Sequence, residues 1–329
     1  MNSVDSSTGR GGTPVPQNAF MDHFNLEART QRVWDLNHAV WFTLMGLGGG
    51  VFLVGRILNL TEGLGHCLGI PMVDIVSFVA IAIGGLILVA DLGRPLQFWR
   101  AFANIRTSWI SWGAWADLVF LTVAGLLVLP ALTFGDLQPF DGLGWEPDGS
   151  DATGLAMEIL AGVAAIVVMT YAGAVLARPR SIPYWNSPAV PIQFFLSSSA
   201  MSVAAVLLLT AIHDEPISGG QMLLLGGLTT GLLTSVIVHL STHQNAPGKQ
   251  QSLDSLLRGI HRRVFVGGVM VLGTAVPALL AFVGATTSGI REVAAMISFA
   301  LLLPGGLMLR LTTLRVGIFP PVHIPASRR

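Results

Sequence analysis

The feature that most constrains the fold of this chain is a series of eight apolar stretches, each long enough to cross a lipid bilayer. Inside hydrocarbon a backbone must satisfy its own hydrogen bonds, so stretches of this kind are expected to be helices. Apolar residues make up 52% of the chain, charged residues make up 11%, and the mean hydropathy is +0.67. The sequence therefore predicts an all-α polytopic membrane protein with eight transmembrane helices, packed as two four-helix bundles. The stretches cover residues 37–60, 67–90, 108–134, 152–177, 189–213, 219–243, 262–287 and 292–316.

The basic residues are distributed unequally between the two ends of these spans. An even number of spans places both termini on one side, and all but two of the 18 Lys and Arg residues are assigned to that side. The exceptions are Arg56 and Arg291. Because connections that carry an excess of Lys and Arg face the cytoplasm, both termini are predicted to be cytoplasmic.

One connection on this basic side has an unusual composition. Residues 91–115 read DLGRPLQFWRAFANIRTSWISWGAW, with three arginines, four tryptophans and the helix-breaking Pro95. Arginine pairs with carboxylates, and tryptophan prefers the level where hydrocarbon meets water. The segment is therefore expected to lie on the membrane boundary, either as a docking platform for a partner or as an anchor that fixes helix tilt.

The ends of the chain divide it further. Residues 1–19 are polar and rich in Gly, Ser and Pro, which predicts a flexible tail without a cleavable signal. Residues 20–33 place apolar side chains among charges, which is typical of a short interfacial helix or of an irregular lead-in. The membrane domain is expected to cover residues 34–318 and to be followed by a C-terminal tail at 319–329.

Several polar residues are expected near the basic ends of the spans. His38 has Asp35 one turn earlier and Asn37 beside it, while Tyr171 and Asp117 lie deeper in the fourth and third spans. Histidine and tyrosine can donate hydrogen bonds to the carbonyls of a quinone, and a carboxyl group can exchange protons. These residues predict either a quinone pocket or a set of ordinary interfacial polar groups.

Three further charged residues are predicted in the opposite half of the membrane. Arg56, Asp74 and Glu158 lie near the other ends of the first, second and fourth spans. They are interpreted as a structural ion pair of Arg56 with either acid, or as the outer part of a proton path that includes Asp117. His239 and His243 are one turn apart in the sixth span. This spacing is compatible with a metal or haem site and also with an ordinary polar helix end.

The composition also restricts the cofactors that the protein itself can hold. Cys67 is the single cysteine, so an internal disulfide and a four-cysteine iron–sulfur cluster built from this chain alone are excluded. The eight histidines lie mostly at span ends, whereas a membrane haem needs two axial histidines at matching depth on facing helices. No haem, iron–sulfur cluster or metal is expected in this chain, and nothing predicts nucleic acid as a partner.

Three stretches together resemble the polysulfide reductase NrfD family. They are Asn37–His38 before a Gly-rich span, DLGRPLQFW with the following TSWISWGAW, and TYAGAVLARPRSIPYWN from Thr170 to Asn186. Where relatives of the polysulfide reductase type have asparagine one turn before the histidine, this protein has Asp35.

The resemblance implies a membrane subunit without cofactors of its own, which forms half of an active site instead of an independent enzyme. Such subunits exchange electrons between a quinone and a ferredoxin-like iron–sulfur subunit. The quinone is menaquinone or ubiquinone, and the iron–sulfur subunit serves a molybdopterin catalytic subunit. It implies location in the prokaryotic inner membrane and a quinone site at His38, Asn37, Asp35 and Tyr171. The docking residues implied are Asp91, Arg94, Trp99, Arg100, Arg106, Arg178 and Trp185.

Two other functions are compatible with the residues alone. A secondary transporter would use the buried carboxylates, although its binding site would be expected near the membrane midplane. A haem b anchor would need the facing histidines that the spans lack. The terminal substrate of a complex would be determined by a different subunit.

Overall fold

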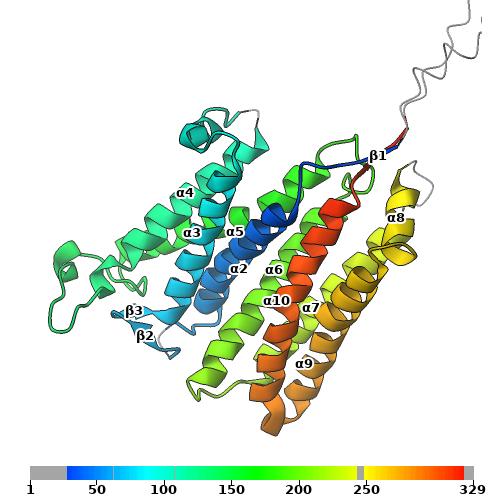
Figure 1. Ribbon diagram of the computed structural model, residues 1–329. Coiled ribbons are helices and arrows are strands. Elements are labelled where there is room, and N and C mark those ends of the chain that lie inside the picture. Colours follow the sequence, from blue (N-terminus) through cyan, green and yellow to red (C-terminus); the bar gives the residue numbers. More distant parts are fainter. Residues whose placement is uncertain (1–27, 62, 107, 243–247, 322–329) are drawn as a thin grey trace, which may run out of the picture.

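The computed structural model describes residues 28–321 except 62, 107 and 243–247, and eight of the described helices are long and apolar enough to cross a membrane. They run side by side as a bundle (Figure 1). The protein is therefore a multi-pass, all-α membrane protein, as predicted. Its spans are α2 (Leu36–Ile57), α3 (Met72–Asp91), α4 (Trp109–Leu127), α5 (Ala152–Ala177), α6 (Ala189–Ile212), α7 (Gly219–Ser241), η5 with α9 (Arg263–Ala275 and Val276–Thr286) and α10 (Arg291–Arg315).

Short elements connect the spans. The apolar run predicted that the third span ends near residue 134. The helix ends at Leu127 instead, because a 3₁₀ turn and loops follow. At the other end of the protein the connection after α3 forms the 3₁₀ helix η2. The connecting elements are β2 (His66–Cys67), β3 (Ile70–Pro71), η2 (Pro95–Phe102), η3 (Leu129–Ala131), η4 (Asp141–Leu143), α8 (Lys249–Leu257) and η6 (Ser288–Ile290).

The two described ends of the protein lie together. Strand β1 (Arg29–Thr30) pairs antiparallel with β4 (Ile318–Phe319), with Arg29 opposite Phe319. Both ends are thus on one side of the bundle, as an even number of spans requires. Most of the interfacial helix expected at 20–33 lies outside the described residues, and its described part forms β1 instead of a helix. Strand β4 likewise occupies the start of the expected C-terminal tail.

The spans form two groups of four. Helices α2 to α5 make the first group, and α6, α7, η5 with α9, and α10 make the second (Figure 1). Helix α2 contacts α3 and α5 in its own group and also packs on α6 and α10 of the other. It is therefore the central helix, and most of its residues are buried.

Glycines on α2 make this central position geometrically feasible. A Cβ at Gly48 would lie 2.7 Å from the Ser77 carbonyl oxygen on α3, and one at Gly50 would overlap Ser202 Oγ on α6. Real Cβ atoms do not approach other atoms so closely, so the neighbouring helices pack directly against the α2 backbone. The Gly-rich run is a packing surface, in agreement with its composition.

An ion-pair cluster joins three helices at the end of the bundle away from the termini. Arg56 Nη2 lies 3.1 Å from Asp74 Oδ1, and Arg56 Nε lies 3.8 Å from Glu158 Oε1. The predicted pairing of Arg56 with an acid of a neighbouring span is confirmed, and Arg56 contacts both candidates. Arg56 thereby supplies a counter-charge for the buried Asp74 carboxylate and links α2 to α3 and α5.

Arg310 is the main difference from the predicted distribution of charge. The sequence assigned it to the basic connections, but its side chain is 1% exposed inside α10. Its guanidinium donates to Ser198 Oγ at 2.7 Å and Ser197 Oγ at 3.2 Å, and it stacks over the Phe194 ring. Neutral oxygens of α6 thus hold this charge inside the membrane, and it does not belong to the surface pattern that predicts sidedness.

The glycine contacts of α2 predict the effect of adding one methyl group. Gly50→Ala should destabilise the protein by about 1–3 kcal/mol, because the new Cβ forces α2 away from Ser202. Gly85→Ala on α3 is the matched control, since nothing lies within 4 Å of a Cβ built there. Thermal unfolding of the detergent-solubilised protein measures both. Equal stability of the two variants would contradict the proposed packing role.

Candidate functional site

The first turn of α2 carries a polar cluster at the end of the bundle where the termini lie. Asp35 is the N-cap of α2, and its Oδ1 accepts a hydrogen bond from the Asn37 amide at 3.1 Å. The same oxygen lies 3.0 Å from His38 Nδ1. Helix capping therefore places the three residues, since an Asp side chain satisfies amide groups that the first turn leaves unpaired.

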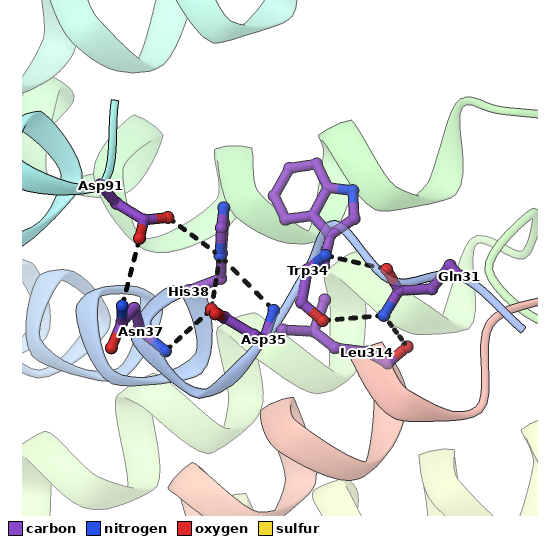
Figure 2. Close-up of polar contacts among 7 residues, drawn as sticks. All are labelled: Gln31, Trp34, Asp35, Asn37, His38, Asp91 and Leu314. Atoms are coloured by element: carbon purple, nitrogen blue, oxygen red, sulfur yellow. Dashed lines mark hydrogen bonds and ion pairs between the residues drawn. The ribbon is translucent and has the colours of Figure 1, made fainter. Parts of the chain in front are cut away.

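Asp91 at the end of α3 completes the cluster. Its Oδ1 accepts from Asn37 Nδ2 at 3.1 Å, and its Oδ2 lies 3.5 Å from His38 Nδ1 (Figure 2). The family resemblance implied a docking role for Asp91, but the structure brings its side chain to His38 from the neighbouring helix. Asn37 contacts Asp91 instead of His38, so carboxylates are the polar partners of the imidazole.

The hydrogen bonds define the tautomer of His38. One ring nitrogen cannot both donate to Asp35 Oδ1 and accept from the Asp35 amide 3.5 Å away, so the shorter contact assigns the proton to Nδ1. The other ring nitrogen points away from Asp35 (Figure 2). No partner for Nε2 is found among the described residues, so this atom can exchange a hydrogen bond or a proton with a ligand.

A hydrogen bond stabilises the ionised form of Asp35. The hydrogen bond from His38 holds the pKa of the Asp35 carboxyl below its ordinary value of 3.8. The side chain of His38 is 15% exposed, whereas that of Asp35 is 59% exposed, so the cluster extends from solvent towards the interior. Atoms of Asp35, His38 and Asp91 lie within 4.8 Å of one another, which is close enough to bind a metal ion.

Aromatic rings continue inwards from His38. Trp34 and Trp41 have ring centroids 4.9 Å and 6.2 Å from the imidazole, and Trp41 is stacked on Tyr171 at 6.0 Å. Trp34 is held in place by Gln31, which donates to the carbonyl oxygens of Trp34 and Leu314 (Figure 2).

Trp41 contributes a buried hydrogen-bond donor that was not among the predicted site residues. The residue is 4% exposed, and its Nε1 has no acceptor among the residues that the structure describes. An unpaired buried N–H is costly, which indicates a site for a ligand acceptor. A tryptophan one turn after His38, on a helix that begins at a polar N-cap, was the sequence signal that could have identified it.

Tyr171 lies between α2 and α4. Its hydroxyl donates to the weak acceptor Met45 Sδ at 3.5 Å, and a Cβ at Gly113 would overlap its ring. Tyr171 therefore occupies a slot that a glycine leaves open. His38 and Tyr171 do not touch, because Trp41 separates their rings.

A cavity of about 740 Å³ reaches Tyr171 from the lipid-facing side of α4 and α5. Its walls include Trp109, Trp112 and Thr170, with Arg106 and Arg178 at the end near the polar cluster. The Arg178 guanidinium lies 5.2 Å from the Trp109 ring centroid. A flat, largely apolar molecule could approach Tyr171 through this opening from the bilayer.

Asp117 lies one turn deeper than Gly113 on α4. It is buried, its Oδ1 has no hydrogen-bond partner among the described residues, and it shares a face of α4 with Gly113, whose missing Cβ leaves room for the Tyr171 ring. The structure therefore places Asp117 with Tyr171, while Arg56, Asp74 and Glu158 form their separate cluster at the other end of the bundle.

Six of the seven residues assigned to partner docking are exposed, and one is buried. Arg94, Trp99 and Arg100 are exposed on and beside η2, with Arg100 over the Trp99 ring. The docking role predicted for Trp185 is wrong. This residue is 2% exposed, and its indole N–H donates to the Thr313 carbonyl oxygen at 2.7 Å. A buried ring cannot contact a partner, so Trp185 instead stabilises the end of α10.

His239 shows how a histidine in a span can be structural. Its Nε2 lies 3.1 Å from the Tyr184 carbonyl oxygen, and its Nδ1 lies 3.3 Å from Gln193 Nε2. Both nitrogens are therefore occupied by neutral groups, which is the arrangement of a polar helix end. His243, its predicted metal or haem partner, lies outside the described residues.

The pKa of Asp35 provides a test of the cluster. In the folded protein the Asp35 carboxyl should titrate below 3.8, and His38→Ala should raise its pKa. Because the folded-state pKa is lowered, the cap stabilises the protein above the ordinary pKa and loses this effect as the pH falls through the folded value. Carbon-13 NMR of labelled aspartate measures the titration.

The matched control for this titration is Asp148. Its pKa is also lowered, by hydrogen bonds from Ser150 in a loop at the other end of the bundle, and should not respond to His38→Ala. An Asp35 pKa that is unchanged in His38→Ala would contradict the role assigned to the hydrogen bond.

Comparison with known proteins gives consistent matches. A model of the family described as "Polysulphide reductase, NrfD" matches residues 25–321. The protein is similar to the C subunit of polysulfide reductase from Wolinella succinogenes, with 26% identity over 56% of its own length and 60% of that relative. It is also similar to protein NrfD of Escherichia coli K12, with 27% identity over 87% of its own length and 95% of that relative.

Proposed function

Because the protein belongs to the polysulphide reductase NrfD family, we propose that it is the quinone-reactive membrane anchor of a multi-subunit oxidoreductase complex. In this proposal it passes electrons between the quinone pool, menaquinone or ubiquinone, and a ferredoxin-like iron–sulfur subunit. That subunit would in turn serve a molybdopterin catalytic subunit. The observation that carries the proposal is the unpaired, buried Trp41 N–H between His38 and Tyr171.

The side chains around Trp41 fit the chemistry of a quinone. A bound quinone supplies reversible two-electron, two-proton redox chemistry, and it needs donors at its carbonyls and a flat apolar wall. The Trp41 N–H lacks an acceptor among the described residues, and the Tyr171 hydroxyl has only a thioether sulfur. Both groups would gain a stronger hydrogen bond from a carbonyl oxygen, and the rings of Trp109 and Trp112 line the cavity beside Tyr171.

His38 is proposed to move protons at the aqueous edge of this site. Its Nδ1–H is held by Asp35 and Asp91, so a proton taken up or released by the side chain is exchanged at Nε2. Asn37 fixes the orientation of Asp91 by donating a hydrogen bond to its Oδ1. Protons can therefore enter from solvent through the exposed side of the cluster.

Asp117 is proposed to be the inner proton-exchanging group. A carboxyl group buried in a span without a counter-ion is costly unless it has a function. Its position one turn below the Tyr171 slot would allow exchange between the site and the interior of the first helix group. The cluster of Arg56, Asp74 and Glu158 is proposed as the outer part of the same path.

The partner surface is proposed on η2 and the connection around it. Arg94, Trp99 and Arg100 expose charge and aromatic area directly after Asp91, whose side chain belongs to the polar cluster. A subunit docked there would bring an iron–sulfur cluster near His38 without entering the membrane. From the basic composition of this end, we propose that it faces the cytoplasm of a prokaryotic cell.

Three variants test the quinone site. His38→Ala, Tyr171→Phe and Trp41→Phe should each lower quinone-linked electron transfer by about tenfold or more, since each removes a single donor or proton-exchanging group. Trp41→Phe keeps an aromatic ring, so its effect should appear mainly as a raised KM for quinone. His261→Ala, at the same end of the protein, is the matched control.

Assembly must be measured in the same preparations. The variant proteins should still co-purify with iron–sulfur and molybdenum subunits from native membranes, so that any loss of activity reports on the site. Full quinone turnover in all three variants would remove the site assignment. A protein that purifies alone and moves a solute into liposomes would instead support a transporter.

Asp117→Asn tests the proton path separately. The substitution keeps the size of the side chain but removes its proton, so turnover should be uncoupled from proton translocation across reconstituted vesicles. Proton uptake and quinone turnover are measured together. If wild-type vesicles translocate no protons beyond those that the quinone itself takes up or releases, the proposed proton path through Asp117 is wrong.

A further inference from the structure

A second polar cavity lies in the other group of helices. It has a volume of about 440 Å³ and lies where the connection between α5 and α6 meets the last turn of α7 and the start of α8. Its lining includes Arg180, Lys249, Asn186 and His239. Lys249 is the only lysine in the sequence. The proposed quinone function uses none of these residues.

The cavity carries positive charge without an acid. Lys249 is 3% exposed, and its ammonium group donates to the Thr242 carbonyl oxygen. An ammonium group has three donors, and no other acceptor for Lys249 is found among the described residues. Within the described part of the protein Arg180 forms no ion pair, and no Asp or Glu lines the cavity.

His239, which also lines the cavity, is neutral and does not change its charge. Its Nδ1 accepts from Gln193 Nε2, which leaves Nε2–H to donate to the Tyr184 carbonyl oxygen. The imidazole is therefore held in its neutral form by its partners. Two cations remain, and a buried ammonium group without a counter-ion is unfavourable unless an anion joins it.

The position of the cavity near the membrane boundary indicates which kind of anion can bind there. Val238, which lines it, is 53% exposed on α7, close to the end of a membrane-spanning helix. The cavity thus meets the bilayer at the level of the lipid headgroups, and Pro183, Pro188 and Ala189 provide apolar wall. Basic pockets between helices at this level suit anionic headgroups.

We propose that this cavity binds the phosphate of an anionic phospholipid between the Arg180 guanidinium and the Lys249 ammonium group. The lipid would join the connection between α5 and α6 to α8, two segments that lie on the same side of the membrane. This site is separate from the proposed quinone site and does not depend on the proposed function.

The single lysine makes a direct test practicable. An amine-reactive acylating reagent labels only Lys249 and the α-amino group of the full-length protein, so mass spectrometry resolves the two. In nanodiscs, adding phosphatidylglycerol to phosphatidylcholine should slow the acylation of Lys249 several-fold and leave the α-amino group unaffected. Arg180→Gln should remove this protection, whereas Arg258→Gln, which changes an exposed arginine on the same side, should retain it.

Two controls identify the source of the phosphate. Inorganic phosphate added to phosphatidylcholine nanodiscs should protect Lys249 much less than phosphatidylglycerol does, and native mass spectrometry should find bound phosphatidylglycerol that Lys249→Gln loses. Equal labelling with and without phosphatidylglycerol would overturn the proposal. So would equal protection by inorganic phosphate, or protection that requires partner subunits, since these outcomes assign the site to free phosphate or to an acidic protein.

Discussion

The close packing of α2 against its neighbours is the constraint on which the rest of the structure depends. Glycine positions on this helix let the backbones of α3 and α5 and serine side chains of α6 approach it directly, so α2 is fixed on several sides at once. Its first turn is consequently held at a defined height and rotation. The fixed first turn determines the positions of Asp35, Asn37 and His38. It also allows their contact with Asp91 at the end of α3.

The site that results spans a gradient from water to hydrocarbon. Carboxylates lie at its outer, more exposed edge, and the rings of Trp41 and Tyr171 are buried in the interior. Such a gradient separates two tasks, because protons are exchanged at the wet edge while an apolar ring is held inside. The cavity between α4 and α5 would give a lipid-soluble molecule its own approach from the bilayer.

Depth in the membrane could be predicted from the sequence, but rotation of the helices could not. Hydropathy locates the eight spans to within a few residues at most ends, and their even number places both described ends together. The pairing of Arg56 with Asp74 also follows from depth. In contrast, the contact between Asn37 and Asp91 joins residues 54 positions apart, and it depends on how two helices turn towards each other.

Two tryptophans and one arginine show the same limit. Apolar composition could not distinguish the exposed Trp99 from the buried Trp185. Arg310 resembled a helix-end charge in the sequence, although paired serines on α6 hold it inside the bundle. These features depend on neighbours that are distant in the sequence, so the structure was needed to find them.

The central claim is that a quinone binds beside Trp41, between His38 and Tyr171. The most direct measurement is photolabelling of the assembled complex with a photoreactive quinone, followed by peptide mapping. Label on the first turns of α2 and the last turns of α5, displaced by excess unmodified quinone, is the predicted result. Displaceable label confined to α6, α7, α9 or α10, with none on α2 or α5, would contradict the account.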